Sequence, residues 1–166
     1  MMKRLWTWIA VPALLCGCTM ASYPEAPGGA PTATLVFSKG HESGFGYSGS
    51  QTYSISENME CTDLKKAAVL LWTTPHSEEA HVAAGHRITV MAVTTYFYGG
   101  PYTEHGNTTC EGAASFVLEA GHSYDVSQLE QFGGKCHMSV LDSATRQKPP
   151  GIKFIDEASC NRALKD

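Results

Sequence analysis

The sequence predicts an all-β fold, a small antiparallel β-sandwich of about seven strands with two disulfides. Short runs rich in β-branched and aromatic residues recur between Gly- and Pro-containing turns, roughly ten residues apart, which is typical of sandwiches and small barrels. No extended helical pattern competes with these runs. The length of 166 residues fits one domain with tails, and four cysteines lie downstream of an export-type leader.

The first 17 residues have the character of an export signal. Lys3 and Arg4 form a positive start, and the apolar run Leu5–Leu15 follows. These 11 residues are too few to cross a bilayer, and Pro12 interrupts the run, which disfavours a buried helix. We therefore expect residues 1–17 to be a signal peptide that is removed on export.

The end of this leader resembles the lipobox of bacterial lipoproteins. In Leu15-Cys16-Gly17-Cys18 a Leu stands three residues before the final Cys, and a small Gly stands just before it. The resemblance implies cleavage before Cys18, a diacylglyceryl thioether on its sulfur and an acylated amino terminus, which together give stable membrane anchoring. Cys16 occupies a position where Ala or Ser is commoner. Ordinary cleavage after Ala21 is the alternative.

The residue after the candidate lipid-bearing cysteine bears on localisation. In lipoproteins of this type an Asp there usually signals inner-membrane retention, so Thr19 implies the outer membrane, facing the periplasm. Removing the 17 leader residues takes away Lys3 and Arg4 and leaves 149 residues with 10 Lys+Arg against 16 Asp+Glu. This acidic balance argues against nucleic acid as a partner, because nucleic-acid binders carry basic patches.

Residues 18–32 have the composition of a flexible linker, rich in Pro and Gly, and residues 33–166 that of the folded domain. His86–Tyr98 is expected at the centre of a sheet because apolar groups occupy both of its faces. Ala67–Thr73 is an unbroken apolar run that fits a strand buried on both sides, and a helix starting near Asp63 is the alternative. The expected strands, in chain order, are Ala33–Ser38, Thr52–Ser56, Ala67–Thr73, His86–Tyr98, Thr108–Leu118, Ser123–Val126 and Lys135–Asp142.

Two turn motifs resemble those of a family of small bacterial lipoproteins of uncharacterised function. Ala84-Gly85-His86 precedes one expected strand, and Ala120-Gly121 followed by Tyr124 precedes another. In that family, turns of this kind lead two strands of an immunoglobulin-like or transthyretin-like β-sandwich. The resemblance covers about Ala33 to Asp142 and implies a fold but no reaction, because folds of this class host many functions.

The cysteines predict two disulfides. Cys61, Cys110, Cys136 and Cys160 remain after the leader is removed, an even number in an exported chain. Strand alternation places Cys110 and Cys136 on the apolar faces of their segments, so these two are expected to pair. Cys61 and Cys160 then pair and tie the tail back to an earlier turn. A four-thiolate zinc site is disfavoured because the mature chain has no C-x-x-C.

Motifs for catalysis, metal or cofactor binding do not occur in the sequence. The histidines lack the helical spacing of a zinc site, and His86 and His122 fall in turns, where an imidazole is usually solvated. The nucleophile motif G-x-S-x-G is missing, and the glycine-rich stretch 44–49 lacks dinucleotide spacing. We expect a protein that is not an enzyme, with no catalytic residue, metal or cofactor. A glycosidase would need two carboxylic acids that act as a pair. The candidate pairs lie in polar runs typical of solvated surface: Glu57 with Glu60, and Glu78 with Glu79.

Aromatic residues give the best binding signal. Phe45 and Tyr47 lie in the glycine-rich stretch between the first two expected strands, where rings can stack on sugars or anchor a protein. The pattern nevertheless favours the plainer interpretation, in which Tyr47 is merely exposed and Tyr96 and Tyr98 complete the core. The favoured function is a lipid-anchored, non-enzymatic binding or structural protein of the bacterial envelope, whose partners are the membrane and an envelope protein or glycan. A periplasmic inhibitor or immunity protein that docks this loop into an enzyme, and a carbohydrate-binding module, are the alternatives.

Overall fold

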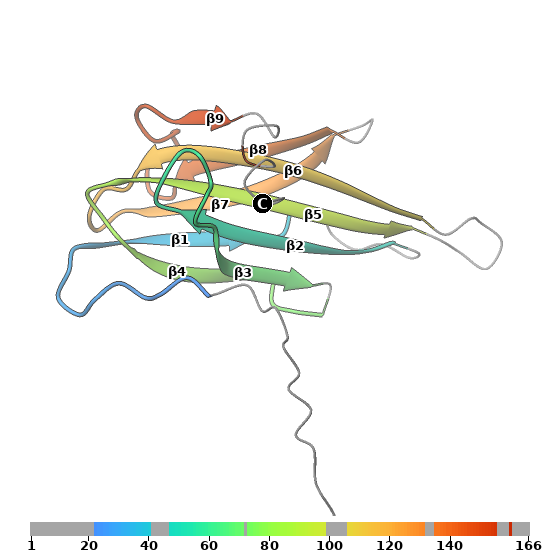
Figure 1. Ribbon diagram of the computed structural model, residues 1–166, viewed down its shortest axis with the longest axis horizontal. Helices are drawn as coiled ribbons and strands as arrows, with labels where there is room; N and C mark the ends of the chain where they lie inside the picture. Colours follow the sequence, from blue (N-terminus) through green and yellow to red (C-terminus); the bar gives the residue numbers. More distant parts are fainter. Residues whose placement is uncertain are drawn as a thin grey trace, which may run out of the picture.

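The computed structural model describes residues 22–40, 47–71, 73–98, 106–131, 135–155 and 160, and this part of the chain forms nine strands (Figure 1). The all-β prediction is confirmed, with more strands than the seven or so expected. The described residues contain no helix that is long and apolar enough to cross a membrane. The strands are β1 (Thr32–Ser38), β2 (Tyr47–Ser56), β3 (Lys65–Leu71), β4 (Ser77–Ala83), β5 (Arg87–Tyr98), β6 (Gly106–Val117), β7 (Ser123–Gln131), β8 (Lys135–Asp142) and β9 (Lys153–Ile155).

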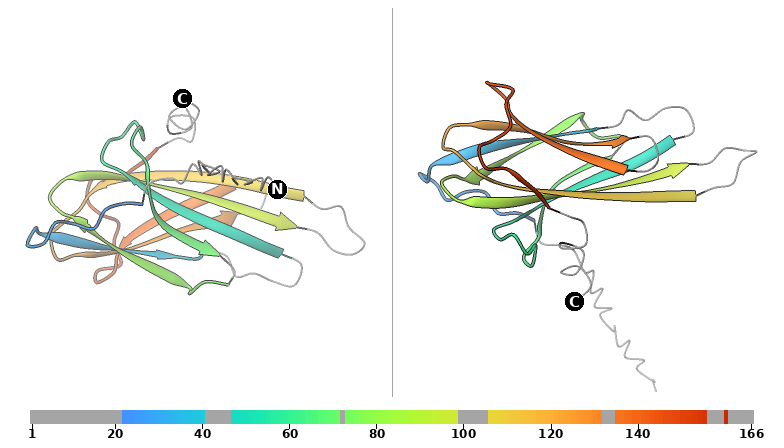
Figure 2. Two further views of the ribbon diagram at one scale, coloured as in Figure 1. Left: turned by 60° about the horizontal axis from the view of Figure 1, so that its bottom comes forward. Right: turned by 90° about the horizontal axis from the view of Figure 1, so that it is seen from above.

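The strands form two stacked sheets (Figure 2). One sheet has four strands in the order β4-β1-β7-β8, and the other has five in the order β3-β2-β5-β6-β9. β1 runs parallel to β7, and the other neighbouring strands in these sheets are antiparallel. β5 pairs with β2 on one side and with β6 on the other, which confirms its expected central position.

The core lies between the sheets and follows from strand alternation. On β5, the alternate residues Ile88, Val90 and Ala92 point inward and are fully buried, as a two-residue period predicts. Aromatic side chains fill much of the volume. Phe37 stacks on Tyr53 with ring centroids 4.9 Å apart, and Phe116 meets Tyr124 edge-on at 5.5 Å. Full burial of each large apolar side chain of this kind contributes about 1.5–3 kcal/mol.

Several strands differ from the sequence-based expectation. β3 is an edge strand that alternates between partly and fully buried residues, and it is not buried on both sides as its apolar run suggested. β4 was not predicted, because Ser77, Glu79 and His81 are exposed on this edge strand and its sequence resembles solvated surface. β2 begins five residues earlier than expected, at Tyr47, and β7 continues to Gln131.

The segment expected to be a flexible linker is partly fastened to the domain. Of residues 18–32, the structure describes residues 22–32, which run along the edge strands β3 and β4 (Figure 1). Tyr23 donates its backbone N–H to Lys66 O at 2.8 Å, and Ala26 donates to a carbonyl of β4 at 3.4 Å. The Tyr23 ring also packs against the core. Only residues 18–21 of the expected linker precede this fastened stretch.

Both expected disulfides are present. Cys110–Cys136 joins β6 to β8 and so links the two sheets. Cys61–Cys160 joins the turn after β2 to the end of the chain, as expected from the sequence. Together with Met91, this second disulfide belongs to a small apolar cluster separate from the main core. The two cross-links therefore hold together segments that no single hairpin connects.

The two glycine turns noted in the sequence have equivalent backbone roles. Gly85 precedes β5 with φ 88°, and Gly121 precedes β7 with φ 78°, a region that glycine adopts without steric cost. Gly85 donates its N–H to Leu118 O at 2.8 Å, and Gly121 donates to Thr32 O at 2.8 Å. Each turn thus fixes the start of its strand against a neighbouring element.

Candidate functional site

The strand ends that flank four connections point toward one end of the sandwich, the right-hand end in Figure 1. These connections join β1 to β2, β3 to β4, β5 to β6 and β7 to β8. A rigid scaffold that presents several connections at one end is a common arrangement for binding. The strand registers bring these ends together, pairing Ser38 with Ser77, Ser50 with Leu71, and Tyr47 with Tyr98.

The two residues predicted to bind a partner belong to this end. Phe45 lies between β1 and β2, outside the residues that the structure describes. Tyr47 is the first residue of β2 and pairs with Tyr98, so it is a strand residue and not a loop residue, contrary to the expectation. The difference arises because pairing with β5 continues through Gly49, which the sequence had suggested as part of a loop.

A buried polar network fastens the base of the β1–β2 connection. Gln51 accepts the Gly40 backbone N–H at its Oε1 atom, at 2.9 Å. Its Nε2 atom donates to Thr94 Oγ1 at 3.1 Å and to Gln128 O at 2.9 Å. The Thr94 hydroxyl donates to Gln128 Oε1, and Gln128 Nε2 donates to Ala92 O at 3.3 Å. Because buried polar groups are costly unless paired, this network specifies how β1, β2, β5 and β7 meet.

Tyr53 and Gly40 complete this buried network. The Tyr53 hydroxyl donates to Ser38 O at 2.9 Å and accepts the Gln128 backbone N–H at 3.2 Å. Burial raises the pKa of the Tyr53 hydroxyl, which therefore stays protonated and keeps donating. Gly40 approaches β7 so closely that a Cβ atom there would lie 1.6 Å from Gln128 O. The end of β1 is thus held against β7 at a position that admits only glycine.

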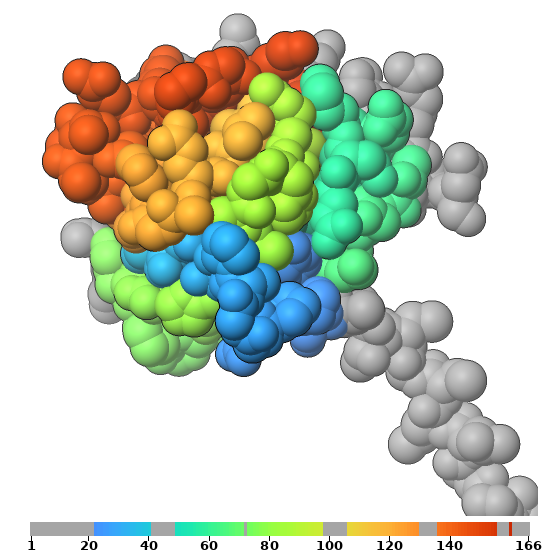
Figure 3. Space-filling view, turned by 90° about the vertical axis from the view of Figure 1, so that its left-hand side faces the viewer, coloured from blue at the N-terminus to red at the C-terminus, as the bar shows by residue number. Residues whose placement is uncertain are grey.

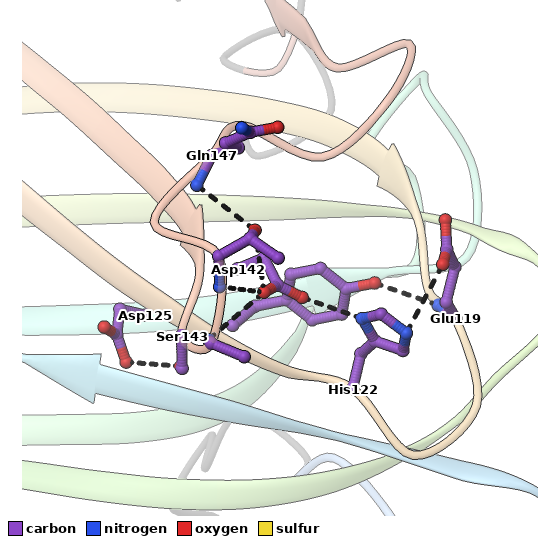
Figure 4. Close-up of polar contacts among 9 residues, drawn as sticks. Glu119, His122, Asp125, Asp142, Ser143 and Gln147 are labelled. Carbon is purple, nitrogen blue, oxygen red and sulfur yellow. Dashed lines mark hydrogen bonds and ion pairs between the residues drawn. The ribbon is translucent and has the colours of Figure 1, made fainter.

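The opposite end of the sandwich, seen face-on in Figure 3, carries a histidine–carboxylate cluster, drawn in Figure 4. His122 lies in the turn before β7, and its Nδ1 atom is 2.7 Å from Asp142 Oδ2 at the end of β8. Its Nε2 atom is 3.5 Å from Glu119 Oε2. The other oxygen of Asp142 accepts the backbone N–H groups of Ala144 and Thr145 and the Thr145 hydroxyl.

These contacts shift two pKa values in opposite directions. The hydrogen bond from His122, followed by the one from the Thr145 N–H, lowers the pKa of Asp142 to about 2. The hydrogen bond to Asp142 raises the pKa of His122 above 6.5, and the negative charges of Asp142 and Glu119 add to this shift. The pair is therefore ionised on both sides at mildly acidic pH.

A depression of about 210 Å³ lies beside this cluster, bordered by Tyr124, Lys148 and two prolines. The Tyr124 hydroxyl accepts the Glu119 backbone N–H at 3.0 Å. Among the described residues, Glu119 supplies the contact to His122 Nε2, and no hydroxyl or thiol there is hydrogen-bonded to this atom. No group of three or more potential metal ligands occurs among the same residues. The cluster is built to clamp the turns at this end.

The sequence did not single out this cluster, because its members lie far apart along the chain. The sequence places His122 in a turn, where an imidazole is usually solvated, and its partner Asp142 is 20 residues away. The one available signal was the hairpin itself, since β7 and β8 pair in a register that sets Tyr124 opposite Asp142. His86 directly follows the other turn glycine, Gly85.

No known family model matches the chain, and no curated protein matches it. The resemblance to small envelope lipoproteins therefore stays a prediction. The predicted lipidation site Cys18 and the signal peptide, residues 1–17, lie outside the described residues.

Proposed function

We propose that this chain is a lipid-anchored, non-enzymatic binding protein of the bacterial cell envelope, held at the outer membrane and facing the periplasm. The two disulfides support an oxidising compartment, because such cross-links persist in exported proteins and are rare in the cytosol. The leader that ends in Leu15-Cys16-Gly17-Cys18 supports the lipid anchor.

One observation carries the binding role: in the cross-linked sandwich the strand ends that flank four connections point toward one end, and buried Gln51 fastens the base of the β1–β2 connection. That connection contains Phe45, and Tyr47 begins the strand that follows. A rigid base lowers the conformational entropy that an aromatic loop loses when it docks. We therefore assign partner binding to Phe45 and Tyr47.

The anchor is tested by fractionation of cells that express the full chain. Cys18→Ser should release the protein from the membrane fraction, because it removes the sulfur that carries the lipid. Cys16→Ser is the matched control, since it changes the same chemical group two residues earlier and should leave the protein membrane-bound. A Cys18→Ser chain that stays in the membranes, cleaved or uncleaved, contradicts the lipid anchor.

The binding role is tested by chemical crosslinking and pull-down from the native envelope. The double variant Phe45→Ala with Tyr47→Ala should lose the captured partner while its thermal unfolding stays cooperative. Phe154→Ala is the control, because Phe154 is 47% exposed on β9, at the other edge of the five-stranded sheet from β3. Full retention of every partner by the double variant contradicts the assignment. A captured periplasmic hydrolase or toxin that is inhibited by the chain would make it an inhibitor, and glycan-array binding would make it a carbohydrate-binding module.

A further inference from the structure

We infer that, in the anchored protein, the surface formed by Ser22, Tyr23, Lys65 and Lys66 lies against the lipid membrane. The inference rests on the proposed lipid anchor at Cys18 and adds the orientation of the domain to it. Three features carry it: the attachment of Ser22 and Tyr23 to β3, the further attachments downstream, and the short stretch of chain that separates Ser22 from Cys18.

The first described residues are attached directly to the edge of β3. Ser22 forms a β-bridge with Lys66, and Tyr23 donates its N–H to Lys66 O at 2.8 Å. The Tyr23 ring packs on the edge of the core, and the Lys65 ammonium lies 6.0 Å from the ring centroid. Backbone pairing, ring packing and a cation–π contact therefore hold the same two residues.

The chain after Tyr23 is also held and cannot serve as a tether. Ala26 donates its N–H to His81 O at 3.4 Å, and Pro31 accepts the Ala84 N–H at 2.8 Å. β1 begins immediately afterwards, at Thr32. Pulling the chain away from the domain would thus break contacts with both β3 and β4.

The remaining tether is short. Four residues, 18–21, precede Ser22, and a fully extended chain spans at most about 3.3–3.6 Å per residue, so the reach from Cys18 to Ser22 is about 14 Å. A free linker over residues 18–32 would reach about 50 Å by the same rule. A lipid-bearing Cys18 at the bilayer surface therefore keeps the β3 edge next to the headgroups.

The chemistry of this surface suits a membrane interface without strong charge attraction. The partly buried Tyr23 combines an apolar ring with a hydroxyl, and Lys65 and Lys66 carry long stems with cationic ends. Burial raises the pKa of Tyr23, and the negative charges of Glu57 and Asp63, which lie close by, raise it further. Because cations and carboxylates are mixed here, the tether length sets the orientation, and we expect high salt to leave it unchanged.

Fluorescence quenching in vesicles tests the orientation. The full-length, cell-processed protein is placed in phosphatidylcholine–phosphatidylglycerol vesicles that contain lipids with nitroxide-labelled headgroups. A fluorophore is attached to Lys66→Cys in one sample and to Lys148→Cys in another. Lys148 lies over Phe154 on β9, at the edge of the five-stranded sheet opposite β3. We expect several-fold stronger quenching at position 66 than at position 148, at low and at high salt.

A tether variant separates this inference from the proposed function. Inserting a Gly/Ser segment of about 12 residues between Ala21 and Ser22 should abolish the difference between the two labels, because such a segment is a flexible coil. The protein should still bind the vesicles. Equal quenching at both positions in the lipidated, vesicle-bound protein contradicts the orientation alone. A processed chain that lacks lipid and does not bind vesicles contradicts the anchor and the orientation together.

Discussion

The Nδ1 atom of His122 lies 2.7 Å from Oδ2 of Asp142, and this contact joins the turn before β7 to the end of β8. The pKa of His122 is raised above 6.5, so its contribution to stability is complete below pH 6.5 and is lost as pH rises through the raised value. The pKa of Asp142 falls from 3.8 to about 2, so its contribution is complete above pH 3.8 and is lost as pH falls through about 2.

The pair therefore stabilises the fold most between about pH 4 and pH 6.5. We expect Asp142→Asn to lower the thermal unfolding temperature most in this window, and the difference from the wild type to shrink on either side. Asp125→Asn is the control, because Asp125 pairs with Arg146 on the surface and does not contact His122. The unfolding temperature of Asp125→Asn should fall above pH 6.5 as that of the wild type does. If the unfolding temperatures of Asp142→Asn and the wild type differ by the same amount at all pH values, the His122–Asp142 pair does not stabilise the fold as proposed.

Gly40→Ala should lower the free energy of unfolding by about 3 kcal/mol, because overpacking usually costs about 1–3 kcal/mol and this contact is severe. The new Cβ atom would lie 1.6 Å from Gln128 O, which is backbone, so β1 or β7 has to shift. Urea unfolding measures this loss of free energy. Gly28→Ala is the control, since nothing lies within 4 Å of a Cβ atom there. Equal stability of the two variants would show that β1 does not approach β7 in this way.

Gln51→Leu should cost about 1–3 kcal/mol for each buried group that loses its partner. The Gly40 N–H and Gln128 O would both be left unpaired. Gln147→Leu makes the same chemical change at an exposed position and should have little effect on the free energy of unfolding. If both variants unfold at the same urea concentration, the network does not fasten the base of the β1–β2 connection.

The two disulfides should stabilise to different extents. The sequence separation is 26 for Cys110–Cys136 and 99 for Cys61–Cys160. The loop-closure model then gives contributions of about 3.5 and about 4.7 kcal/mol. Each disulfide is removed by replacing both of its cysteines with Ser, and the free energy of unfolding is measured in urea. Removing Cys61–Cys160 should cost more stability than removing Cys110–Cys136. A larger loss on removing Cys110–Cys136 would show that native-state contacts, and not loop length, dominate.

Much of the fold could be predicted from local patterns. The segment around β5 is dense in β-branched and aromatic residues, and the alternation in β6 and β8 placed Cys110 and Cys136 on facing sides. The disulfide pairing followed from that alternation. β4 escaped prediction because an exposed edge strand does not need the apolar period that marks a buried one.

The long-range contacts could not be predicted from the sequence. Gln51 and Gln128 are polar residues separated by 77 positions, and only the stacking of the two sheets shows that they are buried together. The Pro- and Gly-rich stretch before β1 has the composition of a linker, and its attachment depends on Tyr23 meeting the edge of β3. The composition of a segment indicates only its local conformational preference, whereas these contacts depend on partners distant in the chain.

Intact mass spectrometry of the protein purified from membranes tests the central claim most directly. We expect a mature chain that begins at Cys18, carries the mass of a diacylglyceryl group and an amino-terminal acyl chain, and has all four remaining cysteines oxidised. A chain that begins after Ala21 without lipid, or that retains Met1 and has free thiols, would contradict it.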